Sequence, residues 1–361
     1  MLYLLAENFI RLEFLKSIYL RGFLAFVISF LIVLLSGNKF INYLKIKKFG
    51  ENIRNEGPET HKTKKGTPTM GGVLIVFSIL ITSLISTNIF SKYIVIVFIS
   101  TILFAAIGFV DDYKKFKVSK KGLSGKKKLM GQGIISFIVW FFVYKFGMTG
   151  NYRIDMALVN PINGSWFYIG YFLMFIFILL IIMASSNSVN ITDGLDGLAI
   201  MPMVICSAVL ATIAYFSGHI EISSHLKLFY IPGISEIGIF LCSVAGSGLA
   251  FLWYNFYPAQ IFMGDTGSLT LGGILGVCSI LLKQEFILPI IGFVFVIEAA
   301  SVIFQVLYFK KTGKRIFKMA PLHHHYELSG LMETKITVRF WITSLIFGIL
   351  ALGIIRMRGF I

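Results

Sequence analysis

The sequence has little charge and few residues that would break an apolar run. Only 14% of its 361 residues are charged, only 17 are acidic and only eight are proline, whereas 57% are hydrophobic. With a mean hydropathy of +0.83, this composition excludes an ordinary water-soluble domain and is typical of a chain that crosses a membrane repeatedly. The three cysteines, Cys206, Cys242 and Cys278, lie in apolar runs without metal or disulfide spacing, so they indicate packing and no chemistry.

Apolar segments of about the length that a helix needs to cross a bilayer recur along the chain. They predict an all-α polytopic membrane protein with about ten transmembrane helices, formed by residues 20–361 of a single domain, 1–361. Two pairs of segments are separated by only a few residues, so nine spans remain an alternative. The predicted spans are 22–40, 71–88, 92–110, 129–147, 168–186, 198–217, 236–256, 260–282, 286–309 and 336–356.

Residues 1–19 differ from the spans, because Glu7, Arg11, Glu13 and Lys16 interrupt their apolar residues. No signal-peptide core or small-residue cleavage pattern is present. We therefore expect an uncleaved amphipathic helix that lies at the membrane interface.

Lysine and arginine predict the orientation, because they accumulate in cytoplasmic loops. Residues 41–70, 111–128 and 310–335 carry seven, eight and six of them, and with ten spans all three are odd-numbered connections. The odd connections, which also include 187–197 and 256–265, are therefore expected to face the cytoplasm, with both termini periplasmic. The acids and imidazoles of interest fall in or beside these loops, which predicts an active-site cleft on the cytoplasmic face.

Asp265 opens the otherwise apolar segment FMGDTGSLTLGG. An ionised carboxylate there would cost several kcal/mol without a cation, and the neighbouring glycines and hydroxyls leave room for a magnesium ion with phosphate oxygens. A structural pairing with a lysine is the alternative. Asp111 and Asp112 end another span, and adjacent helical side chains point about 100° apart, so each is expected to serve a different partner.

Two further motifs are rich in polar side chains. SSNSVNITDGLDGLAI, residues 185–200, joins two spans with two asparagines, two acids and turn-forming glycines, which favours a polar ligand over an ordinary loop. APLHHHYE places three consecutive imidazoles after Pro321. Consecutive helical residues face different ways, so hydrogen bonds or phosphate contacts fit them better than a zinc site. Glu298, inside a span, has no partner that the sequence identifies.

A net charge of +16, concentrated beside carboxylates on one face, suits a reaction between anionic phosphorylated substrates. Nucleic acid is a poor alternative, because membrane spans interrupt the basic segments.

NSVNITDGLDG, FVDDYKK, NFYPAQIFMGDTGS and APLHHHYE, in one chain, resemble the phospho-N-acetylmuramoyl-pentapeptide-transferase (translocase I) family over essentially the whole length. The resemblance implies ten helices, a homodimer in the bacterial inner membrane and a requirement for Mg²⁺. It also implies transfer of phospho-N-acetylmuramoyl-pentapeptide from its UDP carrier, UDP-N-acetylmuramoyl-pentapeptide, to undecaprenyl phosphate, which yields lipid I and UMP.

Residue by residue, the resemblance implies that Asp265 binds magnesium and that Asp111 and Asp112 are catalytic acids, one of which deprotonates the lipid phosphate. His323 is expected among the catalytic residues. The resemblance implies a nucleoside pocket of Asn187, Asn190, Asp193, Gly194, Leu195 and Asp196, with Phe262 stacked on uracil. It assigns Lys64, Thr69, Asn255, Gln305, His324 and His325 to the cleft, and Lys115 and Lys121 to the phosphates.

Two alternatives stay open at this stage. A sister enzyme would transfer N-acetylglucosamine phosphate to the same lipid, although the histidine motif argues against it. An ion-coupled transporter would place its acids near the membrane midplane and commonly in repeated halves, whereas here they gather at one face.

Overall fold

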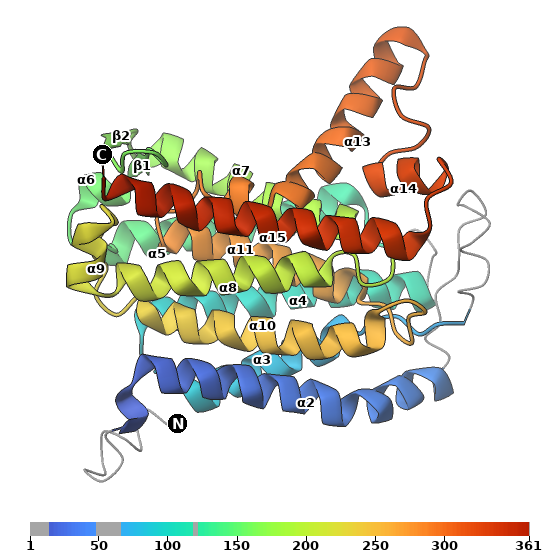
Figure 1. The fold of residues 1–361 in the computed structure, drawn as a ribbon, viewed down its shortest axis with the longest axis horizontal. Helices are drawn as coiled ribbons and strands as arrows, with labels where there is room; N and C mark the ends of the chain where they lie inside the picture. The colour runs from blue at the N-terminus through green and yellow to red at the C-terminus, as the bar shows by residue number, and fades with distance from the viewer. Residues whose placement is uncertain (1–13, 48–65, 118–121, 361) are drawn as a thin grey trace.

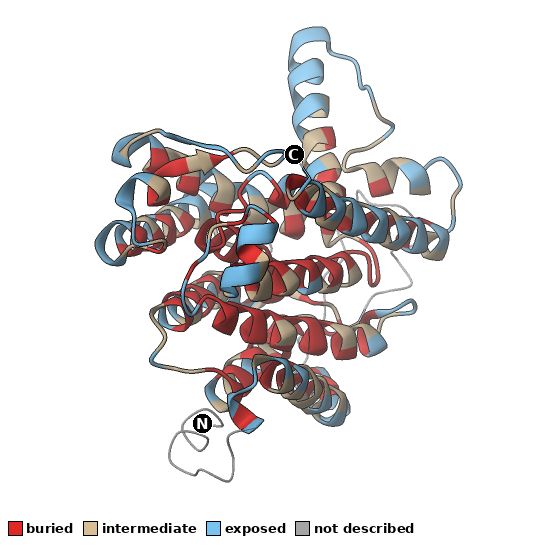
Figure 2. Ribbon diagram, turned by 60° about the vertical axis from the view of Figure 1, so that its left-hand side comes forward, coloured by how far each residue is buried: buried red, intermediate tan, exposed pale blue. Residues whose placement is uncertain are grey.

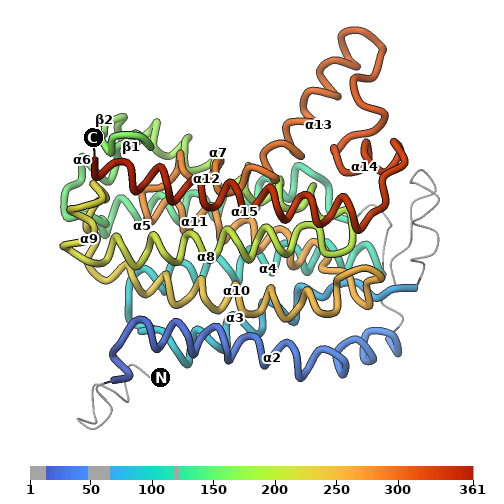
Figure 3. The backbone as a smooth tube through the Cα atoms, viewed as in Figure 1, coloured from blue at the N-terminus to red at the C-terminus, as the bar shows by residue number. Residues whose placement is uncertain are grey.

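The computed structural model describes residues 14–47, 66–117 and 122–360, and these form a bundle of helices with one short hairpin (Figures 1 and 3). The elements are α2 (Ile18–Ile46), α3 (Gly72–Ser86), α4 (Lys92–Lys117), α5 (Gly125–Phe146), α6 (Tyr152–Asp155), β1 (Ala157–Val159), β2 (Trp166–Tyr168), α7 (Tyr171–Thr192), α8 (Ile200–Ser217), α9 (Ile220–His225), α10 (Ser235–Asn255), α11 (Gly264–Leu281), α12 (Leu288–Ile291), α13 (Phe293–Thr312), α14 (Leu322–Glu327) and α15 (Glu333–Arg358).

Within the described residues, nine helices are long and apolar enough to cross a membrane, and each coincides with a predicted span. The other predicted span, 71–88, is the 15-residue helix α3. At about 1.5 Å per residue this helix is about 22 Å long, shorter than the hydrocarbon core of about 30 Å. The prediction of an all-α polytopic membrane protein is confirmed.

Helix α11 is the centre of the bundle, because every residue from Thr266 to Leu281 is buried. Helices α3, α4 and α7 pack closely around it through small residues. A Cβ atom added at Gly72 or Gly108 would overlap the backbone at the start of α11, and one added at Gly272 would overlap the backbone of α7. Close backbone approach of this kind holds helices together where lipid removes the hydrophobic driving force. Figure 2 accordingly shows the central helices as mostly buried.

The predicted span 286–309 is not one helix. Gly292 leaves the helical conformation, with φ −90° and ψ 25°, and separates the short helix α12 from α13. Beyond this break α13 leans away from the other helices (Figure 1). A long apolar run predicts burial in lipid but carries no signal for the direction of the helix after a glycine.

Three helices continue past the ends of their apolar runs. α2 ends at Ile46, α4 at Lys117 and α7 at Thr192, so the loops expected at 41–70, 111–128 and 187–197 start later than predicted. The cause is visible in α4, whose last turn carries three lysines that stabilise the negative end of the helix dipole. Residues 1–13 of the expected interfacial helix lie outside the described residues.

The two ends of the bundle differ. The start of α2, the end of α15, α9 and the antiparallel hairpin that pairs Leu158 with Phe167 lie at one end, and α14 lies at the other (Figure 1). The N-terminus of α2 and the C-terminus of α15 therefore lie at the same end of the bundle. The lysines and arginines predict that this end of the bundle is periplasmic.

Candidate active site

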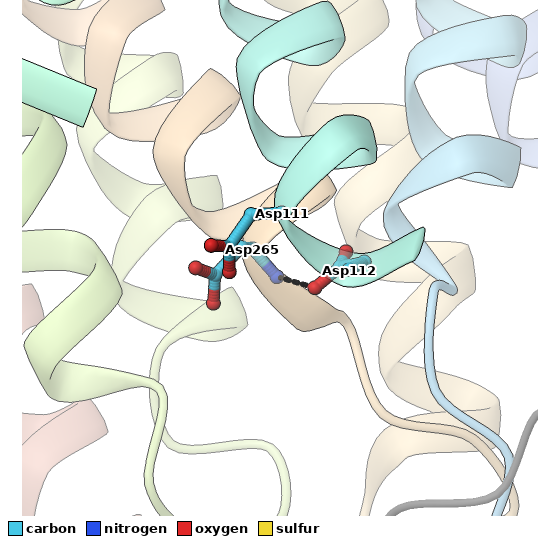
Figure 4. Close-up of side chains that lie close together, drawn as sticks. All are labelled: Asp111, Asp112 and Asp265. Carbon is cyan, nitrogen blue, oxygen red and sulfur yellow. Dashed lines mark hydrogen bonds between the residues drawn. The ribbon is translucent and has the colours of Figure 1, made fainter. Parts of the chain in front are cut away.

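Three carboxylates meet at the end of the bundle where α4 finishes and α11 begins. Asp111 and Asp112 belong to the last turns of α4 and Asp265 to the first turn of α11 (Figure 4). Each offers an oxygen within 4.8 Å of the others. Asp111 and Asp112 are 0% and 4% exposed. Residues 153 positions apart in the sequence thus form one acidic centre.

Asp112 holds the start of α11 in place. Its Oδ1 accepts the backbone N–H of Asp265 at 3.0 Å, and its Oδ2 accepts the backbone N–H and the hydroxyl of Thr266 at 2.8 and 2.6 Å. The first N–H groups of a helix have no partner inside it, so a carboxylate from α4 caps α11. Hydrogen bonds to a charged group contribute about 1.5–3 kcal/mol each. Both oxygens of Asp112 are occupied in this way.

Asp111 and Asp265 share two lysines. Lys115 Nζ lies 2.7 Å from Asp111 Oδ2 and 2.9 Å from Asp265 Oδ1. Lys128, from the first turn of α5, lies 3.1 Å from Asp111 Oδ2 and also contacts Asp265 Oδ2. Asp111 Oδ1 accepts the backbone N–H of Leu123 at 2.6 Å. The three negative charges therefore face two positive ones, and the lysine pairing that the sequence left open for Asp265 is present.

The end of α7 extends this centre with amides. Asn190 Nδ2 donates to Asp265 Oδ1 at 3.1 Å and to Ser268 Oγ at 2.8 Å. Asn187 Nδ2 donates to Gln132 Oε1 of α5 at 2.8 Å. These bonds explain why the helix continues through the polar sequence SSNSVNIT, since each amide finds a partner on a neighbouring helix.

The loop after α7, residues 193–197, is held from two sides. Asp196 Oδ2 accepts the N–H of Ala259 at 2.9 Å, and the N–H of Gly197 donates to Asn255 Oδ1 at 3.1 Å. The N–H of Asp196 donates to Glu333 Oε1 of α15 at 2.8 Å. Gly197 has φ +71°, a conformation that favours glycine. The loop is therefore fixed in place between α15 and the segment that follows α10.

The imidazole of His323 is buried against this loop. Its Nδ1 lies 3.0 Å from Glu298 Oε2, and its backbone N–H donates to Glu298 Oε1 at 3.2 Å. A Cβ atom added at Gly194 would overlap the ring, so the imidazole packs directly against the Gly194 backbone. Burial lowers the pKa of His323, although Glu298 opposes this effect. His323 is therefore neutral near pH 7, with the Nδ1–H donated to Glu298.

The other two histidines bind different groups. His324 Nδ1 lies 2.8 Å from Glu327, and His325 Nδ1 accepts the N–H of Lys318 at 3.1 Å. Among the described residues the histidines join no group that could hold a metal.

The remaining predicted residues vary in how close they lie to the acids. Thr69 lies beside Gly264 and Asp112 at the start of α11. The N–H of Phe262 donates to the carbonyl of Pro68 at 2.8 Å, which ties its segment to the start of α3. Gln305 instead accepts the N–H groups of Ile316 and Phe317 at 3.0 Å and so holds the loop after α13. Lys64 and Lys121 lie outside the described residues.

Sequence reasoning assigned no role in the site to Lys128, Gln132 and Glu333, and it singled out Glu298 without identifying its partner. Lys128 belonged to a basic segment typical of membrane anchoring. The position of Glu298 could have indicated its partner, because a carboxylate inside a span needs one. The histidine motif was the best candidate for that partner. Gln132 and Glu333 carried no signal of their own.

Comparison with known proteins gives the class first. Residues 94–283 match the family model described as Glycosyl transferase family 4, which places the chain in that class. Residues 64–76 match phospho-N-acetylmuramoyl-pentapeptide-transferase signature 1.

Full-length relatives narrow the class. A protein of Fusobacterium nucleatum subsp. nucleatum named phospho-N-acetylmuramoyl-pentapeptide-transferase is 64% identical over 359 residues, 99% of both chains. Proteins of the same name from Endomicrobium trichonymphae and Rickettsia prowazekii are 43% and 44% identical, over 99% and 94% of this chain and 98% and 93% of theirs. The chain therefore belongs to the phospho-N-acetylmuramoyl-pentapeptide-transferase family, and the resemblance stated from its motifs is confirmed.

Proposed function

We propose that this protein transfers phospho-N-acetylmuramoyl-pentapeptide from UDP-N-acetylmuramoyl-pentapeptide to undecaprenyl phosphate, forming lipid I and releasing UMP. The observation that carries the proposal is the convergence of Asp111, Asp112 and Asp265 with two lysines at one end of a membrane bundle. The names of relatives that match over the full chain support the same reaction.

The donor's nucleoside is assigned to the wall built by Asn187, Asn190 and the loop 193–197. This assignment is supported by the fixed backbone of that loop, which donates to Glu333 and Asn255. Phe262 is proposed to stack on the uracil. A rigid wall lowers the entropy cost of binding and orients the diphosphate toward the acids.

Magnesium is the proposed cofactor, with Asp265 as its ligand. The donor set fits, because carboxylate oxygens are what Mg²⁺ prefers and three of them lie within 4.8 Å of one another. Asp112 caps α11 with both of its oxygens and Asp111 is fully buried, whereas 13% of the Asp265 side chain is exposed, so Asp265 is the most accessible of the three acids. When bound, the ion would neutralise charge on the donor's diphosphate as UMP leaves.

The chain's own residues would act as follows. Asp111, 0% exposed and fixed by Leu123, accepts the remaining proton of the lipid phosphate. The deprotonated phosphate oxygen attacks the β-phosphorus of the donor, and the bond from that phosphorus to the UMP oxygen breaks. Lys115 and Lys128 contact Asp111 and offer N–H donors to the phosphates, so they stabilise charge that develops in the transfer.

The lipid's isoprenoid chain is assigned to an apolar groove between α5 and α7. This groove has a volume of about 670 Å³ and is lined by Leu129, Met130, Ile134, Phe137, Phe175 and Leu179, with Lys126 at one end. Lys126 lies two residues before Lys128. A chain in the groove would thus place its phosphate at the end of α5 that also carries Lys128.

We further propose a homodimer in the bacterial cytoplasmic membrane with the acids facing the cytoplasm. The basic segments 111–128 and 310–335 support this orientation, because both flank the acidic end of the bundle and positive loops stay inside.

UMP release tests the reaction. Purified protein should release UMP from UDP-N-acetylmuramoyl-pentapeptide only when undecaprenyl phosphate and Mg²⁺ are both present. Release from UDP-N-acetylglucosamine instead would favour the sister enzyme. Ion-gradient-driven uptake into liposomes without UMP release would favour a transporter.

The number of chemical steps needs its own measurement. In a single displacement, labelled donor without lipid releases no UMP. A burst of UMP equal to the enzyme concentration, or a trapped phosphoaspartate, would establish a covalent two-step reaction instead.

A further inference from the structure

A second groove, lined by none of the three acids, lies between α13, α14 and α15. It has a volume of about 210 Å³, and its wall includes Val294, Ile297, Tyr326, Ile336 and Phe340. A water molecule occupies about 30 Å³ of the liquid, so the groove has room for a segment of hydrocarbon chain. An apolar wall of this kind disfavours a polar guest.

Arg339 of α15 also lines this groove and is exposed. It follows the start of α15 by six residues, or about 9 Å along the helix. Among residues 14–47, 66–117 and 122–360, no carboxylate forms an ion pair with its guanidinium. A cation on a membrane helix normally faces a partner or reaches an interface. The groove therefore combines an apolar wall with one available positive charge.

The surroundings of the groove are lipid-facing. The part of α13 beyond the break projects from the bundle and is largely exposed (Figure 2), and its exposed residues include Ile303, Phe304 and Leu307. An apolar helix that projects in this way is covered by lipid and not by water. A molecule that enters between α13 and α15 therefore comes from the membrane.

These observations select an amphipathic anion. We propose that the groove binds an anionic phospholipid, with an acyl chain against the apolar wall and the phosphate on Arg339. Guanidinium binds phosphate oxygens through two parallel N–H bonds. A net negative headgroup is favoured over a zwitterionic one, because no acid of the described residues pairs with Arg339 to offset its charge.

The same helix connects this groove with the donor loop. On a neighbouring face of α15, Glu333, Thr337 and Trp341 contact the backbone of Asp196 and Gly197 at 2.8, 3.4 and 3.1 Å. These three residues are spaced four apart, so they lie along one stripe of the helix.

A small apolar cluster also connects the groove with the donor loop. Leu195 and Leu198 pack with Val294, Ile336 and Phe340, the last three of which also line the groove. A bound lipid would therefore restrict α15 and the donor loop together. This consequence rests on the proposed function, whereas lipid binding itself does not.

Native mass spectrometry of the full chain, released from nanodiscs of phosphatidylglycerol and phosphatidylcholine, tests the proposal. Wild-type protein should retain one more phosphatidylglycerol per chain than Arg339→Gln. Lys335→Gln is the matched control, because it removes an exposed cation from the same helix outside the groove, and it should retain the wild-type number. Thr343→Leu keeps Arg339 but fills the groove, and it should lose the lipid as Arg339→Gln does.

Three outcomes would overturn the assignment. Equal retention by wild type and Arg339→Gln would mean ordinary boundary lipid, and equal loss from Lys335→Gln would mean attraction to surface charge alone. Displacement of the retained lipid by one equivalent of undecaprenyl phosphate would make the groove an acceptor site.

A kinetic measurement then tests the connection to the donor loop. In phosphatidylcholine alone, the donor KM of the wild type should rise at least threefold, whereas that of Arg339→Gln should not depend on phosphatidylglycerol. Lipid retention is counted without turnover, so failure of the proposed reaction would leave the retention result interpretable. An unchanged wild-type KM with specific retention would refute the connection.

Discussion

The substitution Lys128→Met is the most direct test of how the lysines neutralise the charge of the acidic centre. Lys128 is 17% exposed at its side chain and contacts both Asp111 and Asp265. Three carboxylates face Lys115 and Lys128, which leaves one net negative charge. Methionine keeps most of the side-chain volume and raises that excess to two.

The size of the effect follows from burial. Removing one partner of a buried ion pair costs about 3–5 kcal/mol. Lys128 is partly solvated and Lys115 still neutralises Asp111 at 2.7 Å, so we expect the Lys128→Met substitution to cost about 2–3 kcal/mol. If this loss falls on the transition state, kcat/KM decreases about 30- to 150-fold. Half-saturating Mg²⁺ should not rise, because the variant site is more negative than the native one.

The assay is UMP release at varied donor, lipid and Mg²⁺ concentrations. Lys127→Met is the matched control, since this exposed neighbour lies outside the acidic centre, and Lys128→Arg should recover part of the activity by restoring the charge. The reasoning is refuted if Lys128→Met stays within threefold of wild type, or if Lys127→Met loses as much.

Three further predictions use other parts of the site. Asp265→Asn should reduce UMP release at least 100-fold and raise half-saturating Mg²⁺, and near-normal turnover would remove Asp265 as the metal ligand. Gly194→Ala should raise the donor KM several-fold, because its Cβ overlaps His323 and overpacking costs about 1–3 kcal/mol; an unchanged KM would contradict the close contact. Because burial lowers the pKa of His323, the unfolded chain binds its proton first, so stability is lost as pH falls below about 6.5 toward the folded value. Thermal unfolding midpoints between pH 7.5 and 5.5 should therefore fall more for wild type than for His323→Gln, and equal slopes would refute this.

Much of the fold follows from the sequence, because lipid allows few solutions. A backbone in hydrocarbon must satisfy its hydrogen bonds internally, so each long apolar segment becomes a helix. The break at Gly292 and the direction of α13 could not be predicted, since both depend on the packing around the break. The extension of α4 to Lys117 was missed for a related reason, as hydropathy marks where lipid ends and not where a helix ends.

The acids of the site could be predicted because an ionised carboxylate in an apolar segment is energetically unfavourable, and such a segment is recognisable in the sequence. The partners of these acids could not be predicted. Lys128 is one of eight cations in 111–128, and only the fold decides which of these reaches Asp111. Glu298 and His323 are 25 residues apart, and the break at Gly292 aims α13 so that they meet. Partner choice is a property of helix packing, which local sequence does not encode.

The adjacency of Asp111 and Asp112 acquires a physical meaning from this packing. About 100° separates neighbouring side chains on a helix, so one of the two can cap α11 while the other meets Lys115 and Lys128. Asp112 caps α11 and thereby fixes the position of Asp265, whose own backbone N–H it accepts. Asp111 does not cap α11 and instead contacts Lys115 and Lys128, which can also bind phosphate. Exchange of the two roles would require α4 to rotate by about one residue. Gly108 forbids this rotation, because a Cβ atom at its position would overlap the backbone of Asp265 and Thr266 at the start of α11.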